Sequence, residues 1–511
     1  MKLRRRIVAG VTALVLGAST LAGCAAAVGS ETGTSAVSTA TAVTATEVLA
    51  ANKSVHKITA AEATDAVDIS LSGNTATSNS DAVTVDGSTV TIASAGTYRL
   101  SGMLTDGQIV VDTADQGAVQ LILDNTSIAS STTAAIAVTN AESVQVVLAE
   151  GTENTLSDAN SYADDAVANA ALYSSADLTI SGTGTLTVHG NGNDAIASQD
   201  GLVISSGTIV VDAVDDGIRG KDYLVIDGGT LTVTAGGDGL KADNADDADS
   251  GFISITGGTT TVTAASDGAD AATDLVITGG KTSVASEDDA LHAETTLVID
   301  NGTVDVTKSV EGLESAAIVI NGGEISVVSS DDGVNAAGGT TDETTQAGPG
   351  GGGEAVGDFA VLITGGTLVI DAEGDGLDSN GTAAISGGTV VVNGPTGNGN
   401  GAIDVNGNFT VTGGTLTAAG SAGMAGTPSD DSTQGWVAIT LNQTPPAGTE
   451  VQLVDADDEV VATFVTSKAA QSLVISSAAI RDGESYSVDV GGEVTTVTAG
   501  EAPAGGRGGP R

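Results

Sequence analysis

Acidic side chains recur at one position of a repeated phrase along most of the chain. The phrase is Asp-Gly, an aliphatic residue and a variable residue, as in "DDGIRG" at 215–220 and "GDGLKA" at 237–242. Its first residue forms what we term the acid column: Asp194, Asp216, Asp238, Asp267, Asp289, Glu311, Asp332 and Asp375. Second acids stand beside some of its members, as Asp215 does before Asp216. Paired carboxylates beside backbone carbonyls are the hard oxygen ligands that calcium prefers.

The acids of this column repel one another if the repeats stack. Carboxylates about 5 Å apart repel by roughly 3 kcal/mol per pair at an effective dielectric constant near 20. Because a cation between them removes that cost, the sequence predicts at least one structural calcium ion, with ligands among Asp194, Asp215, Asp216, Asp238, Asp267 and Asp289. The alternative interpretation is that Asp-Gly recurs only because a turn recurs, with the acids in solvent.

A variable column follows the acid column by three residues: Ala197, Arg219, Lys241, Asp270, His292, Glu314, Asn335 and Asp378. Arg219 and Lys241 are neighbours in it, and Lys221 is close to both in sequence. These three bases can bind the carboxylates of an acidic polysaccharide, or they can neutralise acids nearby such as Asp215, Asp243 and Asp270. The aliphatic residue one position before each variable residue is predicted to face inward.

The composition excludes several classes of protein. Acids outnumber bases 65 to 16, which gives a formal net charge of -49 and excludes nucleic acid as a partner. A single Cys excludes an internal disulfide framework and a Cys-based zinc site. Hydrophobic residues make up 40% of the chain but aromatic residues only 2%, which favours thin, closely stacked layers over an ordinary globular core.

A period near 22 residues organises the middle of the chain. Glycines that precede runs like "TLTV" recur at 184, 207 and 229, and again at 258, 280 and 302. Two or three short strands per repeat without a helix predict a parallel β-helix over residues 61–429, whose coils stack about 4.8 Å apart. The Gly-rich segment 338–357 is predicted to be a loop that leaves the repeat intact.

The two ends differ from the repeats. Residues 1–23 combine a basic start with a short apolar stretch, which indicates an export signal. The ending "LAGC" resembles the lipobox of bacterial lipoproteins, so we expect lipidation of Cys24 and a protein held on the outer face of the cell membrane. Conventional cleavage that discards Cys24 is the alternative. We expect a flexible tether over 24–60, an antiparallel β module over 430–500, and a disordered tail over 501–511.

Longer phrases of the chain resemble a family. "AGTYRLSGMLTDGQIVVD", "VQLILDNTSI" and "VQVVLAEGTENTLSDANSY", together with the repeats, are similar to a bacterial carbohydrate-binding domain family known from a surface protein of a cellulolytic clostridium. The resemblance implies a right-handed parallel β-helix like that of calcium-dependent pectate lyases, with bound calcium and affinity for cellulose or polygalacturonate. It also implies calcium ligands at Asp215, Asp216 and Asp238, and at Asp267 and Asp289. Two coils depart from the pattern, with Glu311 in place of Asp and Ala290 in place of Gly.

The sequence therefore predicts a monomeric, calcium-binding surface protein that binds an acidic or cellulosic polysaccharide. No catalytic residue is assigned, because carboxylates are everywhere and no nucleophile motif surrounds the histidines. A uronate lyase that uses Arg219, Lys221 or Lys241 as its base is one alternative function. A structural stalk or adhesin, in which calcium only adds rigidity, is another.

Overall fold

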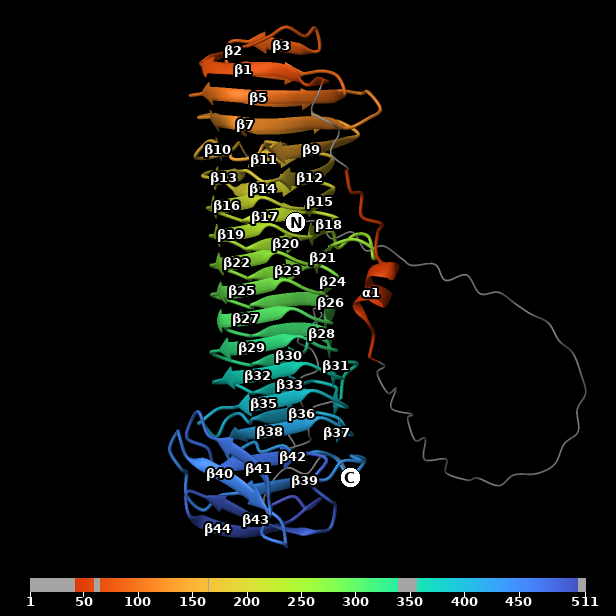
Figure 1. The fold of residues 1–511 in the computed structure, drawn as a ribbon, viewed down its shortest axis with the longest axis vertical. Helices are drawn as coiled ribbons and strands as arrows, with labels where there is room; N and C mark the ends of the chain where they lie inside the picture. The colour runs from red at the N-terminus through yellow and green to blue at the C-terminus, as the bar shows by residue number, and fades with distance from the viewer. Residues whose placement is uncertain (1–41, 59–64, 164, 339–355, 504–511) are drawn as a thin grey trace, which may run out of the picture. The chain divides into compact units, whose positions relative to one another are not determined.

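Each repeat forms one coil of three short strands, and equivalent strands of successive coils pair in parallel (Figure 1). The computed structural model describes residues 42–58, 65–163, 165–338 and 356–503. One coil consists of β17 (Ile218–Gly220), β18 (Tyr223–Ile226) and β19 (Thr230–Ala235). In β19, Thr230 lies beside Thr208 of the preceding coil, 22 residues earlier. The predicted parallel β-helix and its period are confirmed.

Three ladders of strands run along the stack. The first contains β4 (Thr89–Ile92), β6 (Gln108–Asp112), β8 (Ile136–Asn140), β11 (Ala170–Ser174), β14 (Asp194–Ser198), β17, β20 (Leu240–Ala242), β23 (Ala269–Ala271), β26 (Leu291–Ile299), β28 (Leu313–Ile320), β30 (Val334–Ala336), β33 (Leu377–Ser379) and β36 (Ile403–Val405). This ladder carries the variable column, because Arg219 pairs with Lys241 and Lys241 with Asp270.

The second ladder contains β1 (Val67–Gly73), β5 (Gly96–Leu104), β7 (Val119–Ala129), β9 (Ser143–Leu148), β12 (Asp177–Gly182), β15 (Gly201–Ile204), β18, β21 (Phe252–Ile255), β24 (Asp274–Ile277), the later parts of β26 and β28, β31 (Ala360–Ile363), β34 (Thr382–Ile385) and β37 (Phe409–Val411). The third contains β10 (Glu153–Ser157), β13 (Thr185–Gly190), β16 (Thr208–Ala213), β19, β22 (Thr259–Ala264), β25 (Lys281–Ser286), β27 (Thr303–Lys308), β29 (Glu324–Ser329), β32 (Thr367–Ala372), β35 (Thr389–Asn393) and β38 (Thr415–Gly420).

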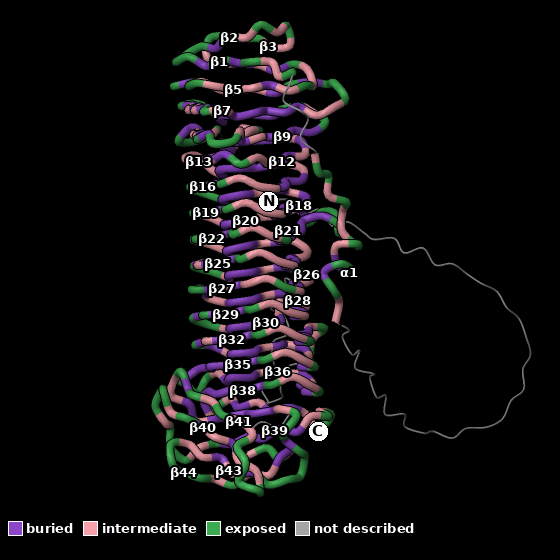
Figure 2. The backbone as a smooth tube through the Cα atoms, in the orientation of Figure 1, coloured by how far each residue is buried: buried purple, intermediate pink, exposed green. Residues whose placement is uncertain are grey.

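The core lies between the ladders and is built of aliphatic residues (Figure 2). The predicted inward column is confirmed, since Ile218, Leu240 and Leu291 are fully buried and stack in register. Glycine is required where the chain turns. Gly258 has a φ of 82°, and a Cβ there would lie 2.8 Å from the backbone of Gly228 in the coil before it. Only a residue without a side chain fits that corner.

Antiparallel strands close both ends of the stack. β1 pairs with β2 (Thr75–Ser78), and β3 (Val83–Asp86) pairs with β4. At the other end β42 (Ser472–Ser476) pairs with both β38 and β39 (Trp436–Thr440). A separate antiparallel sheet follows, made of β40 (Glu450–Val454), β41 (Val460–Val465), β43 (Ser485–Val490) and β44 (Glu493–Thr498). The predicted C-terminal antiparallel module is therefore present.

The prediction of a flexible tether was wrong for residues 42–58. Helix α1 (Ala45–Ala51) packs against outward-facing valines of the second ladder, Val276, Val298 and Val319. The backbone N–H of Ala45 also donates to Asp300 at 3.0 Å. A helix of this length is unstable alone, so it is contacts with residues more than two hundred positions away that hold it. A local sequence pattern does not contain those contacts.

Lysines that follow α1 extend this attachment along the stack. Lys53 forms ion pairs with Asp200 and Asp222, and Lys57 with Asp227 at 2.7 Å. Within the part of the chain that the structure describes, no helix is long and apolar enough to cross a membrane. The export signal, Cys24, most of the Gly-rich loop and most of the tail lie outside the described residues.

Candidate metal centre

Several acids of the acid column join their coil to the next by a hydrogen bond. Oδ1 of Asp216 accepts from the backbone N–H of Asp238 at 3.0 Å, and Oδ1 of Asp238 accepts from that of Asp267 at 3.0 Å. Asp267 accepts from Asp289 at 2.9 Å in the same way. These three acids are thus neither part of a strand nor free in solvent at a turn. Each of the three uses one carboxylate oxygen to satisfy a backbone donor of the next coil.

The second oxygens of the first acids face the two bases of the variable column. Oδ2 of Asp216 lies 3.4 Å from Nζ of Lys241, which also contacts Asp238 and lies 3.9 Å from Oδ2 of Asp270. Arg219 also pairs with two acids. Its Nε lies 3.4 Å from Oδ2 of Asp194, and its Nη1 lies 2.8 Å from Oδ2 of Asp243. In this part of the column Arg219 and Lys241 therefore neutralise nearby acids, which is the second of the two roles that the sequence suggested for them.

Neutralisation leaves the two bases strongly protonated. Burial lowers the pKa of Lys241, but the hydrogen bond with Asp238 and the charges of Asp216 and Asp270 outweigh that effect and raise it overall. The pKa of Arg219 is likewise raised, because Asp243 and Asp194 outweigh its burial. Of the three predicted glycan-binding bases, only Lys221 forms no ion pair with a described residue. It lies half-buried at the corner between β17 and β18.

In the coils that follow Lys241, acidic side chains lie close together without a lysine or arginine between them in the described residues. Three groups of possible ligand atoms lie within 4.8 Å of one another: Asp267 with Asp270 and His292, Asp267 with Asp288 and Asp289, and Asp289 with Glu311 and Glu314. Among the described residues, no lysine or arginine forms an ion pair with Asp267, Asp289, Glu311 or Glu314. The parallel register of β23, β26 and β28 produces these groups, since it places Asp270, His292 and Glu314 side by side.

The predicted metal ligands divide between the two parts of the column. Asp267 and Asp289 belong to the groups, whereas Asp194, Asp216 and Asp238 face Arg219 or Lys241, and the side chain of Asp215 is exposed. Sequence reasoning did not assign ligand roles to Asp270, Asp288, His292, Glu311 and Glu314. The signal was present, because the variable column already aligned Asp270, His292 and Glu314 in adjacent coils.

The coils of Ala290 and Glu311, which depart from the repeated phrase, hold one of these groups. Ala290 is fully buried where most other coils have Gly, and its backbone N–H still donates to the carbonyl of Glu311 at 2.9 Å. The coil spacing is therefore kept. Asn335 donates from Nδ2 to Oε2 of Glu311 at 2.7 Å and so fixes that carboxylate beside Asp289 and Glu314.

Two of these acids have raised pKa values, which favours their protonated form. Burial and the charge of Asp289 raise the pKa of Asp267 to about 7. Burial, a hydrogen bond with Glu314 and nearby charges raise the pKa of Asp289 to about 8. The hydrogen bond between Nδ1 of His292 and Asp270, 2.9 Å long, raises the pKa of His292 to about 9 despite its burial.

The donor set distinguishes between metals. A metal-binding histidine must be neutral, and His292 is held as a cation by Asp270. Apart from Asp270, which holds His292, the remaining donors are carboxylate oxygens of Asp267, Asp288, Asp289, Glu311 and Glu314. Hard oxygen ligands suit calcium or magnesium better than zinc. The residues present therefore fit calcium, with up to five carboxylates spread over three coils.

Comparison with known proteins places the chain in a family. The model of the carbohydrate-binding domain-containing protein family matches residues 86–348, which include the acid column from Asp194 to Asp332. A carbohydrate-binding domain-containing protein of Acetivibrio thermocellus is 39% identical over 139 residues, covering 26% of this chain and 49% of the relative. The chain thus spans about half the length of that relative.

A solved structure described as the polysaccharide lyase-like protein from C. thermocellum, gadolinium derivative, is 34% identical. It covers 43% of this chain and 91% of its own, with a TM-score of 0.42. The family match extends over more than half of the sequence, through most of the coils described above. The chain belongs to the family of carbohydrate-binding domain-containing proteins.

Proposed function

We propose that the protein binds an acidic polysaccharide through calcium ions held between coils by Asp267, Asp288, Asp289, Glu311 and Glu314. The observation that carries the proposal is the change along the acid column. Lys241 and Arg219 neutralise its first members, whereas among the described residues no lysine or arginine forms an ion pair with Asp289, Glu311 or Glu314. Such a group is costly to keep ionised unless a cation joins it.

A calcium ion supplies the link to the sugar. Calcium takes six to eight oxygen ligands, and three carboxylates from adjacent coils leave positions for further oxygens. A uronate carboxylate can fill such a position, whereas the strongly acidic protein repels a polyanion without the ion. Because the groups repeat from coil to coil, an extended polymer can meet more than one ion. The scarcity of aromatic side chains disfavours the flat stacking surface that cellulose would use.

Arg219 and Lys241 give no support to the lyase alternative. A catalytic base must be deprotonated to take a proton, and the pKa values of Arg219 and Lys241 are both raised by their carboxylate partners. We further propose that the protein is exported and anchored through Cys24, as the sequence of residues 1–24 indicates.

The test is binding to polygalacturonate, with calcium or with chelator, while absorbance of unsaturated product is followed. We expect binding in calcium, none in chelator and no product. Asp289→Asn and Glu314→Gln are expected to weaken binding strongly, whereas Glu324→Gln, which removes an exposed carboxylate from the third ladder, is the matched control. Chelator-resistant binding would overturn the proposal. Accumulating product would make the protein a lyase, and no binding in either condition would favour a stalk.

A further inference from the structure

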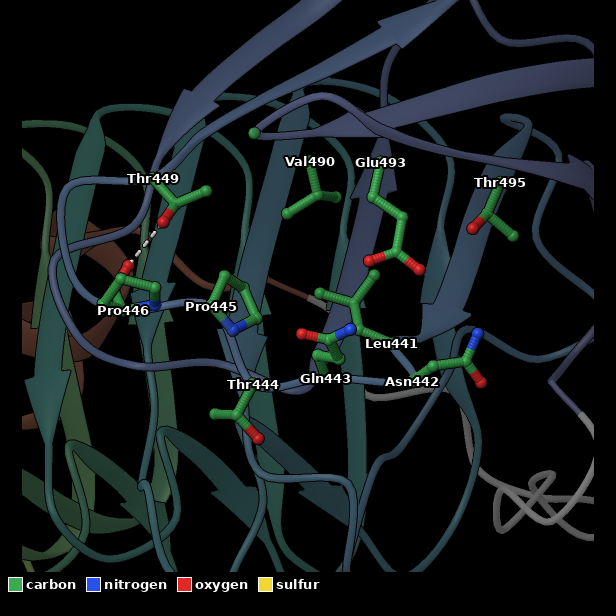
Figure 3. A pocket seen from close by; sticks show the side chains of 11 residues that line it. Leu441, Asn442, Gln443, Thr444, Pro445, Pro446, Thr449, Val490, Glu493 and Thr495 are labelled. Carbon is green, nitrogen blue, oxygen red and sulfur yellow. Dashed lines mark hydrogen bonds between the residues drawn. The ribbon is translucent and has the colours of Figure 1, made fainter.

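The C-terminal module contains a cavity of about 300 Å³, separate from the acid column (Figure 3). Its walls are the segment 441–449, which follows β39, and the turn between β43 and β44 with the start of β44. This region lies outside residues 86–348, which the family model matches. A volume near 300 Å³ is at the lower end of the range for small-molecule sites, so the cavity suits a compact ligand.

The walls of the cavity are fixed in advance. Pro445 and Pro446 restrict the backbone, and the carbonyl of Pro446 accepts hydrogen bonds from the hydroxyls of Thr449 at 2.7 Å and Thr466 at 3.1 Å. The opposite wall turns at Gly491, where φ is 59° and an added Cβ would lie 3.3 Å from Thr449. A preformed site loses little conformational entropy when its ligand binds.

Polar side chains around the cavity have unused hydrogen-bonding capacity. The five that line it without a side-chain hydrogen bond to any described residue are Asn442, Gln443, Thr444, Glu493 and Thr495. Figure 3 shows the carboxylate of Glu493 pointing toward Gln443 and Leu441. Two amides, two hydroxyls and a carboxylate offer both donors and acceptors within a small space. That combination matches a ligand with several hydroxyl groups.

Apolar surface and charge narrow the class of ligand further. Leu441, Pro445 and Val490 provide apolar walls against which the C–H face of a sugar ring can pack. Glu493 is the single charged residue of the lining, so an anionic sugar is repelled. We propose that this cavity binds one or two rings of a neutral saccharide, independently of calcium and of the acid column.

The test is calorimetric titration of the full-length protein in chelator with a panel of neutral sugars. The panel consists of glucose, galactose, mannose, xylose, N-acetylglucosamine and their β-1,4-linked disaccharides, with galacturonate as the anionic comparison. We expect saturable binding of at least one neutral member and none of galacturonate. Glu493→Gln should weaken binding about tenfold, since a hydrogen bond to a charged group is worth roughly that factor, and Asn442→Ala should weaken it about fivefold, because a hydrogen bond between neutral groups contributes less.

Controls separate this site from the acid column. Glu459→Gln removes an exposed carboxylate of the same module outside the cavity, and Asp289→Asn alters the acid column; both should bind the neutral sugar normally. Unchanged melting curves would show that Glu493→Gln and Asn442→Ala still fold. The proposal is wrong if no neutral sugar binds, if galacturonate binds equally well, or if the cavity variants bind as the unaltered protein does.

Discussion

Oδ1 of Asp238 accepts a hydrogen bond from the backbone N–H of Asp267 at 3.0 Å, although the two residues are 29 positions apart. The same contact joins Asp216 to Asp238 over 22 positions and Asp332 to Asp375 over 43. Alignment of the acids therefore has a structural cause in every coil where this bond forms. The coils differ in what the other carboxylate oxygen of the acid contacts. Where it faces Lys241 or Arg219 the acid is neutralised, and where it faces other carboxylates the acid is a candidate cation ligand.

The first prediction concerns pH in the absence of divalent cations. Burial, followed by neighbouring carboxylates, raises the pKa of Asp332 to about 6, of Asp375 to about 7 and of Asp378 to about 8. Unfolded aspartates titrate near pH 3.9. The folded state thus keeps protons that the unfolded state has lost, so this contribution to stability is complete below about pH 4 and disappears by about pH 8.

In chelator, the melting temperature should accordingly fall as the pH rises from 4 to 8. Differential scanning calorimetry across that range measures the effect. Asp378→Asn should flatten the upper part of the profile, because its amide does not titrate. A melting temperature that is constant or rises with pH would show that these carboxyls are not held protonated in the folded protein.

The second prediction concerns calcium and stability. A cation and protons compete for the same carboxylates, so calcium should raise the melting temperature more at pH 8 than at pH 5. Glu314→Gln should reduce the calcium-induced increase, and Glu324→Gln should leave it unchanged. Paired melting curves with calcium and with chelator give the answer. Equal increases at both pH values would contradict displacement of protons by the ion.

The third prediction concerns Lys241, whose side chain is 23% exposed and contacts three carboxylates. Lys241→Met keeps the aliphatic part but leaves Asp216, Asp238 and Asp270 without their cation. We expect a loss of about 2 kcal/mol in the free energy of unfolding in chelator, because removal of the ammonium group leaves partly buried carboxylates without an opposite charge. Calcium should restore part of that loss, and Lys281→Met, on the exposed surface of β25, should have neither effect.

The fourth prediction concerns the glycine that follows most acids of the acid column. At Gly239 an added Cβ would lie 2.2 Å from Cγ1 of Val262 and 2.7 Å from the carbonyl of Gly268. Gly239→Ala should therefore destabilise the protein by about 2 kcal/mol through overpacking. Urea denaturation checks this against Gly399→Ala, where no atom lies within 4 Å of the added carbon. Equal stability of the two variants would show that the coils can separate to admit a methyl group.

Sequence alone predicted the repeating parts of the molecule well, because each coil repeats the same local pattern. The inward column with Ile218 and Leu240, and the pairing of Arg219 with Lys241, could be read from the spacing of the phrase. Helix α1 could not be predicted, since its stability comes from Val276 and Asp300, far away in the sequence.

The candidate metal ligands were predicted only in part, for a related reason. Spacing identifies which acids share a column, but not which oxygen a lysine reaches. Lys241 extends from the variable column across to Asp216 and Asp238, and so neutralises two of the predicted ligands. Glu314 approaches Asp289 from the same variable column and adds a candidate ligand. In both cases the result depends on the direction and length of a side chain that extends from one coil to the next, which residue spacing does not specify.

The hydrogen bond between successive acids also bears on how this protein can change over evolutionary time. It survives insertions between Asp238 and Asp267 and between Asp332 and Asp375, because it depends only on contact between neighbouring coils. After duplication or deletion of a whole coil, the carboxylate of one acid would still meet the backbone N–H of the acid in the coil that then follows it. The stack can thus be lengthened or shortened in whole coils, and the number of coils that carry candidate cation ligands can be adjusted separately by exchanging one residue of the variable column.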